Sequence, residues 1–385
     1  MRRLLLVISA IVLVDTALYA ALAPILPGYA DRFDLSKAEA GFLVAAFGLG
    51  ALAAAVPAGV AAARFGPKPT VLAALALLSV ASVGFGLAPD LPTLAVSRLL
   101  QGVASTLSWV GGLAWIVAAA PRDGRGALIG RTIAAAVVGA LLGPALGAAA
   151  TLVGTRIAFG GVALFALLLF VAALGVAGTD AEPHSFSAVV GGLRDRHFLF
   201  ALWVTLLPSL LFGVLAVLVP LQLGSRGWGA VAISGVFIAA ALVEAVIAPL
   251  TGRLSDRRGR LLPIRAALIA SVAVSLALAG AGAAVMVALF AVLAGAAYGA
   301  LYPPGTAFVA DVSDRIGVSH GLAFAVAQIA WAAGNVVGPS AGGTVAQIAG
   351  DDVAYAAAAA ISFATLVAAS TALGPAVGVT PRGSS

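Results

Sequence analysis

The chain consists of twelve long apolar runs separated by short breaks of polar residues, glycine or proline. A helix needs about 20 predominantly apolar residues to cross a bilayer, and each run is close to that length. The pattern therefore predicts an all-α polytopic membrane protein with twelve transmembrane helices. The expected spans are residues 4–29, 39–62, 70–88, 93–119, 127–151, 156–178, 198–222, 230–251, 263–281, 284–309, 319–347 and 353–374.

Composition supports a membrane protein and argues against an enzyme. Apolar residues make up 62% of the 385 residues and charged residues only 9%, whereas soluble domains carry roughly 25% charged residues. There is no cysteine, which excludes disulfides, thiolate metal sites and cysteine nucleophiles. The sequence also lacks the H-E-x-x-H, G-x-S-x-G and P-loop patterns. We therefore expect no catalytic residues, no metal and no cofactor.

Lysine and arginine predict the orientation in the membrane. If the N-terminus lies inside, sixteen of them fall in cytoplasmic segments and four outside. Cytoplasmic loops carry such an excess, so we expect both termini in the cytoplasm. The net charge of +6 then reflects topology and not a nucleic-acid partner. The Ala- and Arg-rich composition fits a bacterial inner-membrane protein.

Two local patterns recur half a chain apart. The segments that begin at Gly59 and Gly252 are similar and lie 193 residues apart. The Gly-Pro pairs that end at Pro144 and Pro339 lie 195 residues apart. This offset indicates an internal duplication into two six-helix pseudo-symmetric halves, with substrate bound between them near the midplane. The expected division is an N-terminal half 1–179, a cytoplasmic linker 180–197, a C-terminal half 198–374 and a cytoplasmic tail 375–385.

The motifs resemble those of the major facilitator superfamily, and in particular its twelve-span drug:proton antiporters. The segments after spans 2 and 8 resemble that superfamily's Gly-x-x-x-Asp-Arg-x-Gly-Arg-Arg loop, with Ala63 in place of the first aspartate. Three further segments resemble its signatures in spans 5, 4 and 1, namely Gly130 to Gly147, Arg98-Leu-Leu-Gln101-Gly102, and Asp15 followed by Pro24-Ile-Leu-Pro27. The resemblance covers nearly the whole chain and implies a monomer that works by alternating access.

Three ionisable residues are candidates for proton coupling. Asp15 lies roughly 16 Å into span 1, near the centre of a ~30 Å core, and intramembrane acids commonly mark proton paths. Arg98 in span 4 is expected to reach toward Asp15 and tune it, or else to snorkel to the outer interface. Glu244 in span 8 is a second proton site, a cation contact or an anchor for inner-rim arginines. A structural hydrogen bond is the alternative for Asp15.

The glycine–proline signatures are candidates for gating. Glycines four residues apart leave a helix face that permits close approach, and proline bends a helix. We expect spans 5 and 11 to pack and pivot between the halves; packing alone is the alternative. The residues are Gly139, Gly143, Pro144, Gly147, Gly334, Gly338, Pro339 and Gly342. The resemblance further implies that Asp256, beside Arg257, latches the inner side to the opposite half, unless it is a solvated turn acid.

A pocket for a small molecule is expected from polar and aromatic residues at membrane depth, since such sites are apolar with few polar groups. The alternative for each residue is packing. The candidates are Tyr19, Gln101, Trp109, Tyr298, Tyr302, Gln328, Trp331 and Asn335. Gln328 stands where the resembled amine transporters carry an aspartate.

Three functions compete at this point. The first is export of small amphipathic molecules by proton antiport, in which protonation of Asp15 competes with substrate. The second is a nutrient or metabolite symporter or facilitator with the same fold, and the third is a membrane enzyme or receptor. The span 5 signature favours export. The expected partners are a small-molecule substrate, protons and the lipid bilayer.

Overall fold

A computed structural model describes residues 1–120, 125–179, 194–318 and 320–371. All regular structure in these ranges is helical, and twelve helices are long and apolar enough to cross a membrane. The predicted fold class is thereby confirmed. The helices are α1 (Arg2–Ala20), α2 (Leu22–Phe33), α3 (Lys37–Phe65), α4 (Pro67–Leu87), α5 (Leu91–Ala119), α6 (Arg125–Val153), α7 (Thr155–Leu174), α9 (Arg196–Ser225), α10 (Ala230–Arg258), α11 (Leu261–Ala279), α12 (Ala284–Gly299), α13 (Tyr302–Ile316), α14 (His320–Ala349) and α15 (Asp351–Thr371).

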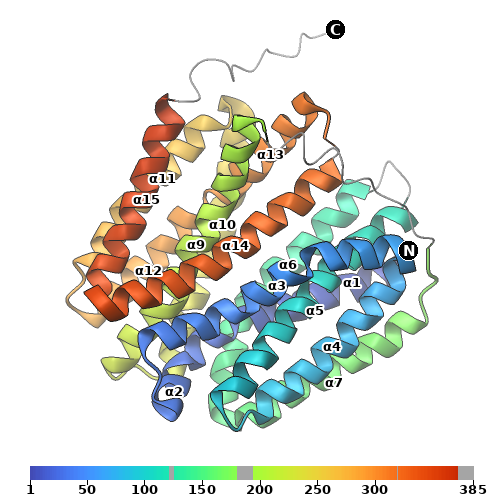
Figure 1. Ribbon diagram of the computed structural model, residues 1–385, viewed down its shortest axis with the longest axis horizontal. Coiled ribbons are helices and arrows are strands. Elements are labelled where there is room, and N and C mark those ends of the chain that lie inside the picture. Colours follow the sequence, from blue (N-terminus) through green and yellow to red (C-terminus); the bar gives the residue numbers. More distant parts are fainter. Residues whose placement is uncertain (121–124, 180–193, 319, 372–385) are drawn as a thin grey trace.

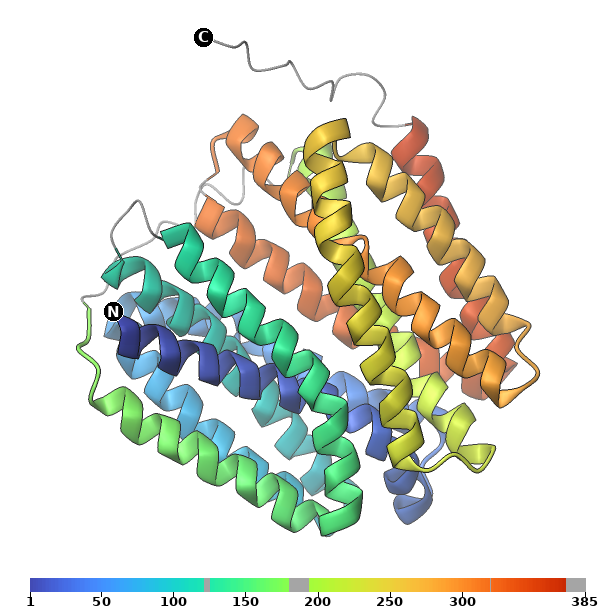
Figure 2. The ribbon, with the colours of Figure 1, turned by 180° about the vertical axis from the view of Figure 1, so that it is seen from behind.

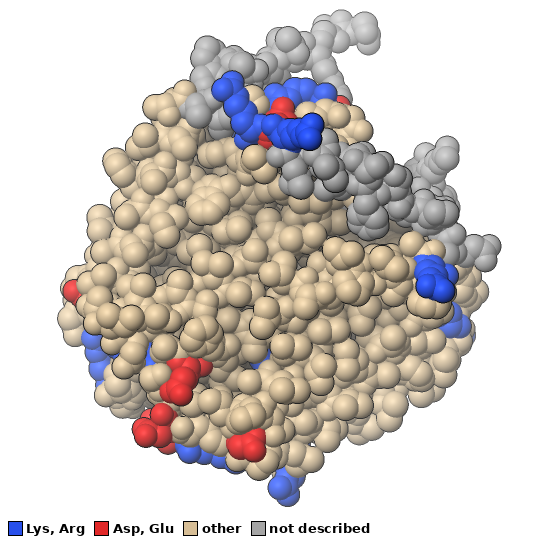
Figure 3. All heavy atoms as spheres, viewed as in Figure 1, with Lys and Arg blue, Asp and Glu red and all other residues tan. Residues whose placement is uncertain are grey.

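The first six spans lie together as one bundle and the last six as a second, with α3 and α14 side by side at their junction (Figures 1 and 2). We call the side at which α1 and α9 begin and α7 and α15 end the linker face. The side that carries the α2–α3 and α14–α15 connections is the opposite face. Lysine and arginine side chains gather near the edges of the molecule, and a broad uncharged band lies between them (Figure 3).

The repeated loop motif has the same backbone conformation in both copies. Gly66 joins α3 to α4 with φ +91°, and Gly259 follows α10 with φ +84°. Residues that carry a Cβ rarely adopt positive φ. Gly66 and Gly259 are therefore explained by the sharp turn that reverses the chain between two spans.

Two predicted spans are each broken into two helices. Residues 4–29 form α1 and α2 with a break at Ala21, and residues 284–309 form α12 and α13 with a break at Ala300 and Leu301. Proline lacks an N–H and cannot pair with the carbonyl four residues before it. Pro24 thus leaves the carbonyl of Ala20 without its helical partner, and Pro303 and Pro304 do the same after α12.

The second bundle begins slightly earlier than expected. Residues 180–193 of the predicted linker and residues 372–385 lie outside the described residues, but α9 already starts at Arg196. The Asp195 carboxylate accepts from the backbone N–H groups of His197 and Phe198 and pairs with Arg315 on α13 at 3.0 Å. Partial burial opposes ionisation, but these donors outweigh it and hold the pKa of Asp195 below its usual range.

The two bundles touch from mid-depth to the opposite face. Lys37 at the start of α3 pairs with Asp351 at the start of α15 at 2.6 Å, and its backbone N–H donates to Gln347 of α14. Gly41 of α3 packs directly against the backbone of Pro339. Near the linker face, the ion pair of Asp195 with Arg315 and the ion pairs of Arg260 with Asp256 and Asp311 each lie within one bundle. The structure is therefore closed at the opposite face.

The duplication is also visible in this interface. Ser234 on α10 donates to the carbonyl of Pro144 on α6 at 2.7 Å. Gly41 and Ser234 are 193 residues apart, as are the loop-motif glycines. The Gly41–Pro339 and Ser234–Pro144 contacts thus relate the two bundles by the pseudo-two-fold arrangement that the sequence predicts.

Candidate functional site

Asp15 is a buried acid on α1, with only 2% of its surface exposed. Its Oδ2 accepts from the Ser105 hydroxyl at 2.8 Å and from Trp109 Nε1 at 2.9 Å. Its Oδ1 has no hydrogen-bond partner among the described residues. Both donors are neutral, and they lie four residues apart on the same face of α5. The carboxylate is therefore held in place by one oxygen, while the other is free for a proton or another partner.

Arg98 neither snorkels nor pairs with Asp15. It is 2% exposed, and no ion pair between the two side chains is found among the described residues. The guanidinium donates to the carbonyls of Leu18 at 2.9 Å and Tyr19 at 2.7 Å, and to Gln101 Oε1 at 3.1 Å. These are carbonyls at the end of α1, where the helix dipole is negative. Arg98 thus caps the break in span 1.

Tyr19 lies next to this break and connects the two bundles. Its hydroxyl donates to Oδ1 of Asn335 on α14, and Asn335 Nδ2 donates to the carbonyl of Trp331 at 3.0 Å. The Tyr19 ring lies 5.2 Å from that of Phe47 on α3 and 5.7 Å from that of Trp331. One residue of span 1 therefore contacts both sides of the junction.

The other side of the site is built around the break in span 10. Tyr302, the first residue of α13, stacks on Phe212 of α9 with ring centroids 6.3 Å apart. It interacts with Tyr19, Glu244 and Trp331. We call Tyr19, Phe47, Phe212, Tyr302 and Trp331 the central aromatic cluster. Its members come from both bundles, as expected for a site near a two-fold axis.

Glu244 is an acid close to Tyr19 and Tyr302 of this cluster. It is half-buried on α10, and within the described residues its carboxylate forms no hydrogen bond or ion pair that would anchor it to arginines of the rim. A Cβ placed on Gly299 would lie 2.9 Å from its Cδ. Glycine at the end of α12 therefore makes room for the acid beside the break.

Four further predicted pocket residues are not members of the central aromatic cluster. Tyr298 packs edge-on against Phe212 of the cluster, with ring centroids 5.6 Å apart, and its buried hydroxyl is hydrogen-bonded to Ser275 at 2.8 Å. Gln101 is fully buried and accepts from Arg98, and Trp109 donates to Asp15. Gln328 is exposed, nearer the linker-face end of α14. Tyr298 thus supports Phe212, Gln101 supports Arg98 and Trp109 supports Asp15. A ligand contact for the exposed Gln328 stays a prediction.

The cluster contains residues that the sequence did not reveal. Phe47 and Phe212 are aromatic residues among many in apolar spans, and no motif marks them. Ser105 carried a weak signal, because it lies seven residues after Arg98 and thus on one face of a helix with it. That spacing identifies the polar stripe of α5 only when Asp15 is known to face it.

The glycine stripes pack within each bundle and not between them. A Cβ on Gly143 would lie 2.7 Å from the carbonyl oxygen of Ala17 on α1, and Gly338 sits directly on the backbone of Leu210 on α9. Their neighbours in each stripe also pack within their own bundle: Gly139 meets α1, Gly147 meets Ala21 and Pro24 at the start of α2, and Gly334 and Gly342 meet α9. The glycines thus pack within each bundle, and the carbonyls of Pro144 and Pro339 contact the opposite bundle. The gating role of these residues stays a prediction.

Asp256 has its partners in its own bundle. It pairs with Arg260 at 2.6 Å, and Arg260 also pairs with Asp311 of α13 at 2.7 Å. Arg257 is exposed. Asp256 therefore does not form the latch to the opposite half in this conformation.

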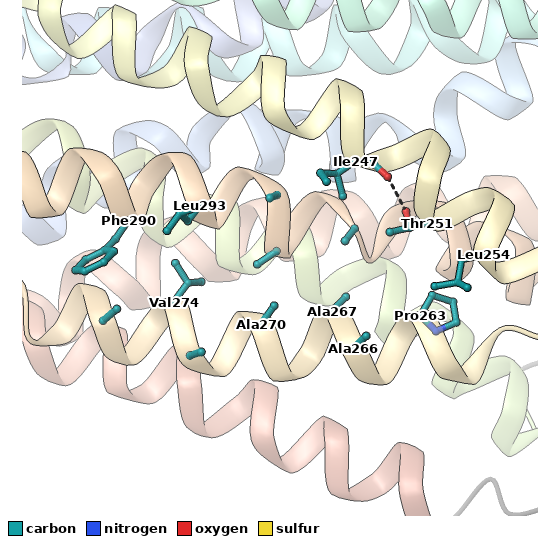
Figure 4. A pocket seen from close by; sticks show the side chains of 15 residues that line it. Ile247, Thr251, Leu254, Pro263, Ala266, Ala267, Ala270, Val274, Phe290 and Leu293 are labelled. Atoms are coloured by element: carbon teal, nitrogen blue, oxygen red, sulfur yellow. Dashed lines mark hydrogen bonds between the residues drawn. The ribbon is translucent and has the colours of Figure 1, made fainter. Parts of the chain in front are cut away.

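A cavity of about 560 Å³ lies outside the central site. It is a groove between α10, α11 and α12, lined by apolar side chains with Leu254 and Pro263 at one end and Phe290 at the other (Figure 4). None of its lining residues belongs to the central aromatic cluster.

Comparison with known proteins agrees with this architecture. The sequence profile of the Major Facilitator Superfamily matches residues 7–319. The chain belongs to the Major Facilitator Superfamily. It is 25% identical over 334 residues to the multi-drug resistance efflux pump PmrA of Streptococcus pneumoniae serotype 4, covering 83% of each chain. It is 37% identical over 139 residues to the MFS-type transporter ppzB of Metarhizium rileyi, but spans only 29% of that protein. A D-xylose–proton symporter shares the fold with a TM-score of 0.77 at 16% identity, over 96% of this chain and 97% of that one.

Proposed function

We propose that this superfamily member is a proton-coupled secondary transporter that exports small amphipathic molecules by alternating access. The observation that carries the proposal is the buried Asp15 carboxyl, with one unpartnered oxygen, next to an aromatic cluster shared by the two bundles. An ionised acid at membrane depth without a cation in ion-pair distance is costly, and such acids commonly mark ion or proton paths. The similarity to PmrA supports export.

In this proposal the linker face is cytoplasmic and the structure represents the state that faces the cytoplasm. Substrate enters between the bundles and binds against Tyr19, Tyr302 and Trp331. Protonation of Asp15 from outside competes with substrate binding, so that proton entry drives export. Glu244 supplies a negative charge beside the aromatic rings, so amphipathic cations are the substrates that this chemistry favours.

A symporter is the second candidate, because the fold is shared with a sugar–proton symporter. The two are distinguished by the direction of coupling in proteoliposomes that contain a pH-sensitive dye. A compound that binds the purified protein is first found by its effect on thermal stability. Export by antiport predicts that an imposed pH gradient moves this compound against the proton flow. Movement of compound and protons in the same direction would instead establish symport.

Orientation is tested with single cysteines, because the chain has none of its own. Ala188→Cys lies in the expected linker, outside the described residues, and Ser225→Cys lies at the opposite face. An impermeant thiol reagent added to intact cells should label position 225 and not position 188. The reverse labelling would place the linker face outside.

A further inference from the structure

The groove between α10, α11 and α12 lies in the second bundle. Its volume of about 560 Å³ falls within the roughly 300–1,000 Å³ of ligand pockets. Along α11 it runs from Pro263 to Ala277, a rise of about 21 Å. That length exceeds half of a ~30 Å hydrocarbon core, so one extended acyl chain of a single leaflet fits along it.

The groove exists because the face of α11 that lines it carries mostly alanine. Ala266, Ala270, Ala273 and Ala277 lie on that face, at helical spacing, and all line the groove. The adjacent face carries Ile269 and Leu276, which are exposed and take no part in it. Its one polar lining residue, Thr251, has its hydroxyl bonded to the carbonyls of Ile247 and Ala248. The groove therefore offers an apolar ligand only dispersion and hydrophobic contact.

The linker-face end of the groove is positively charged. Ile247, Thr251 and Leu254 line it from α10, and Arg258 continues the same helix face one turn further. Arg258 is exposed and forms no ion pair within the described residues, whereas Arg260 is already engaged by Asp256 and Asp311. The N-terminus of α11 lies at the same end, and its dipole also favours an anion.

We propose that this groove binds one molecule of an anionic phospholipid. An acyl chain lies against the alanine face of α11, and the phosphate lies at Arg258. The apolar groove alone selects no headgroup; the unpaired cation at its end supplies the charge complementarity that distinguishes an anionic lipid from a zwitterionic one.

The proposal is tested first on the unaltered protein. The probe is a phosphatidylglycerol with a photoactivatable group in one acyl chain, incorporated into nanodiscs of phosphatidylcholine. Crosslinks are expected on the groove residues Ile247, Thr251, Leu254, Ala266, Ala270, Ala273 and Ala277. Unlabelled phosphatidylglycerol should suppress them more strongly than phosphatidylcholine does. Crosslinks spread evenly over exposed faces, including that of Ile269 and Leu276, would overturn the proposal.

Variants then distinguish the contribution of the lipid's acyl chain from that of its headgroup. Lipid retention is measured by native mass spectrometry. Arg258→Gln should lower retention of phosphatidylglycerol about fivefold and leave phosphatidylcholine unchanged, since one surface cation contributes about that factor. Ala270→Phe fills the groove and should reduce both lipids. The controls are Arg64→Gln, at the linker-face end of α3, and Ile269→Phe, on the other face of α11; both should behave as wild type.

Equal retention of phosphatidylglycerol by Arg258→Gln and wild type would refute the headgroup site. Normal lipid retention by a folded Ala270→Phe protein, combined with loss of transport, would show that the groove admits substrate and not lipid. If Ala270→Phe does not fold, Ala266→Leu, at the same face, replaces it.

Discussion

At the scale of single residues, the site is defined by how the charge of Asp15 is accommodated. Two neutral donors, Ser105 and Trp109, hold one carboxylate oxygen, and no cation lies within ion-pair distance among the described residues. A residue that only stabilised the fold would be expected to have both oxygens satisfied. The free Oδ1 is consistent with a group that gains and loses a proton during the cycle.

Asp15→Asn is predicted to abolish uphill transport driven by a pH gradient. Asparagine retains the size and can still accept from Ser105 and Trp109, but it cannot titrate. Exchange of a neutral substrate should persist, because it requires no net proton movement, whereas binding of a cationic substrate should weaken. The measurement is proton-driven accumulation in inverted vesicles across a range of pH. Wild-type accumulation by this variant would mean that Asp15 is structural.

Glu244→Gln is the matched comparison for Asp15→Asn. Glu244 is half-buried beside the aromatic cluster and is not buried among donors as Asp15 is. We therefore expect the substitution to reduce affinity for cationic compounds while accumulation of neutral ones continues. If Glu244→Gln abolishes proton coupling and Asp15→Asn does not, the carrier is Glu244.

Arg98→Gln is predicted to destabilise the protein by about 3 kcal/mol. Hydrogen bonds from a charged donor contribute roughly 1.5–3 kcal/mol each, and the guanidinium donates to two main-chain carbonyls at the end of α1. The readout is the apparent melting temperature in detergent. Arg226→Gln, at an exposed C-cap on the opposite face, is the control and should lie within about 0.5 kcal/mol of wild type. Equal melting temperatures for the two variants would contradict the capping role.

Sequence reasoning identified Asp15, Tyr19, Tyr302, Trp331 and Asn335 because polar and aromatic residues at membrane depth are few. It did not identify the partners of Arg98. A long cationic side chain in one span is naturally interpreted as the counter-ion of an acid in another span. The competing acceptors are backbone carbonyls released at a helix break, and main-chain groups leave no direct mark on the sequence.

At the scale of helices, the central site lies where two spans are interrupted. The break after α1 supplies carbonyls to Arg98 and orients Tyr19, and the break after α12 places Tyr302 and leaves room for Glu244. Spanning helices tolerate such interruptions where neighbouring groups satisfy the freed backbone. The prolines indicated a bend, but hydropathy alone cannot tell a bend from a break, because both halves of the span remain apolar.

The packing of the glycine stripes gives a prediction at this scale. Gly143→Ala and Gly338→Ala should each destabilise their bundle by about 1–3 kcal/mol, because the added Cβ meets the backbone of α1 or α9. Gly130→Ala, in the same helix as Gly143, is the control: nothing lies within 4 Å of its position, and alanine favours helix by roughly 1 kcal/mol. Thermal unfolding in detergent distinguishes them. Stability of Gly143→Ala equal to that of Gly130→Ala would show that α6 and α1 can separate without cost.

At the scale of the whole molecule, the two bundles are joined by a small number of polar contacts near the opposite face. The duplication and the number of spans followed from the sequence, since both are periodic features of it. The conformational state did not, because the alternating access that we propose requires one sequence to support more than one arrangement of the bundles. Asp256 illustrates this: its motif suggests a contact across the junction, yet here it pairs within its own bundle.

The Lys37–Asp351 ion pair gives the last prediction. It joins α3 to α15, and Gln222 of α9 donates to the second oxygen of Asp351 at 2.8 Å. The ion pair must break if the bundles separate at the opposite face, whereas the Gln222 bond lies within the second bundle and can remain. Because the Lys37 side chain is 37% exposed, water and salt screen the pair, and it contributes at most about 1 kcal/mol. Lys37→Ala should then shift the ratio of conformations by up to about fivefold toward opening at this face.

Distances between spin labels measure this shift. One pair is placed on the exposed residues Arg64 and Arg257 at the linker face, and the other on Asp31 and Ser225 at the opposite face. Lys37→Ala should shorten the first distance and lengthen the second, and high salt should produce part of the same change in wild type. Lys68→Ala is the control, because Lys68 bonds to the carbonyls of Leu174 and Val176 within one bundle. If Lys37→Ala leaves both distance distributions as they are in Lys68→Ala, the ion pair does not hold the opposite face closed.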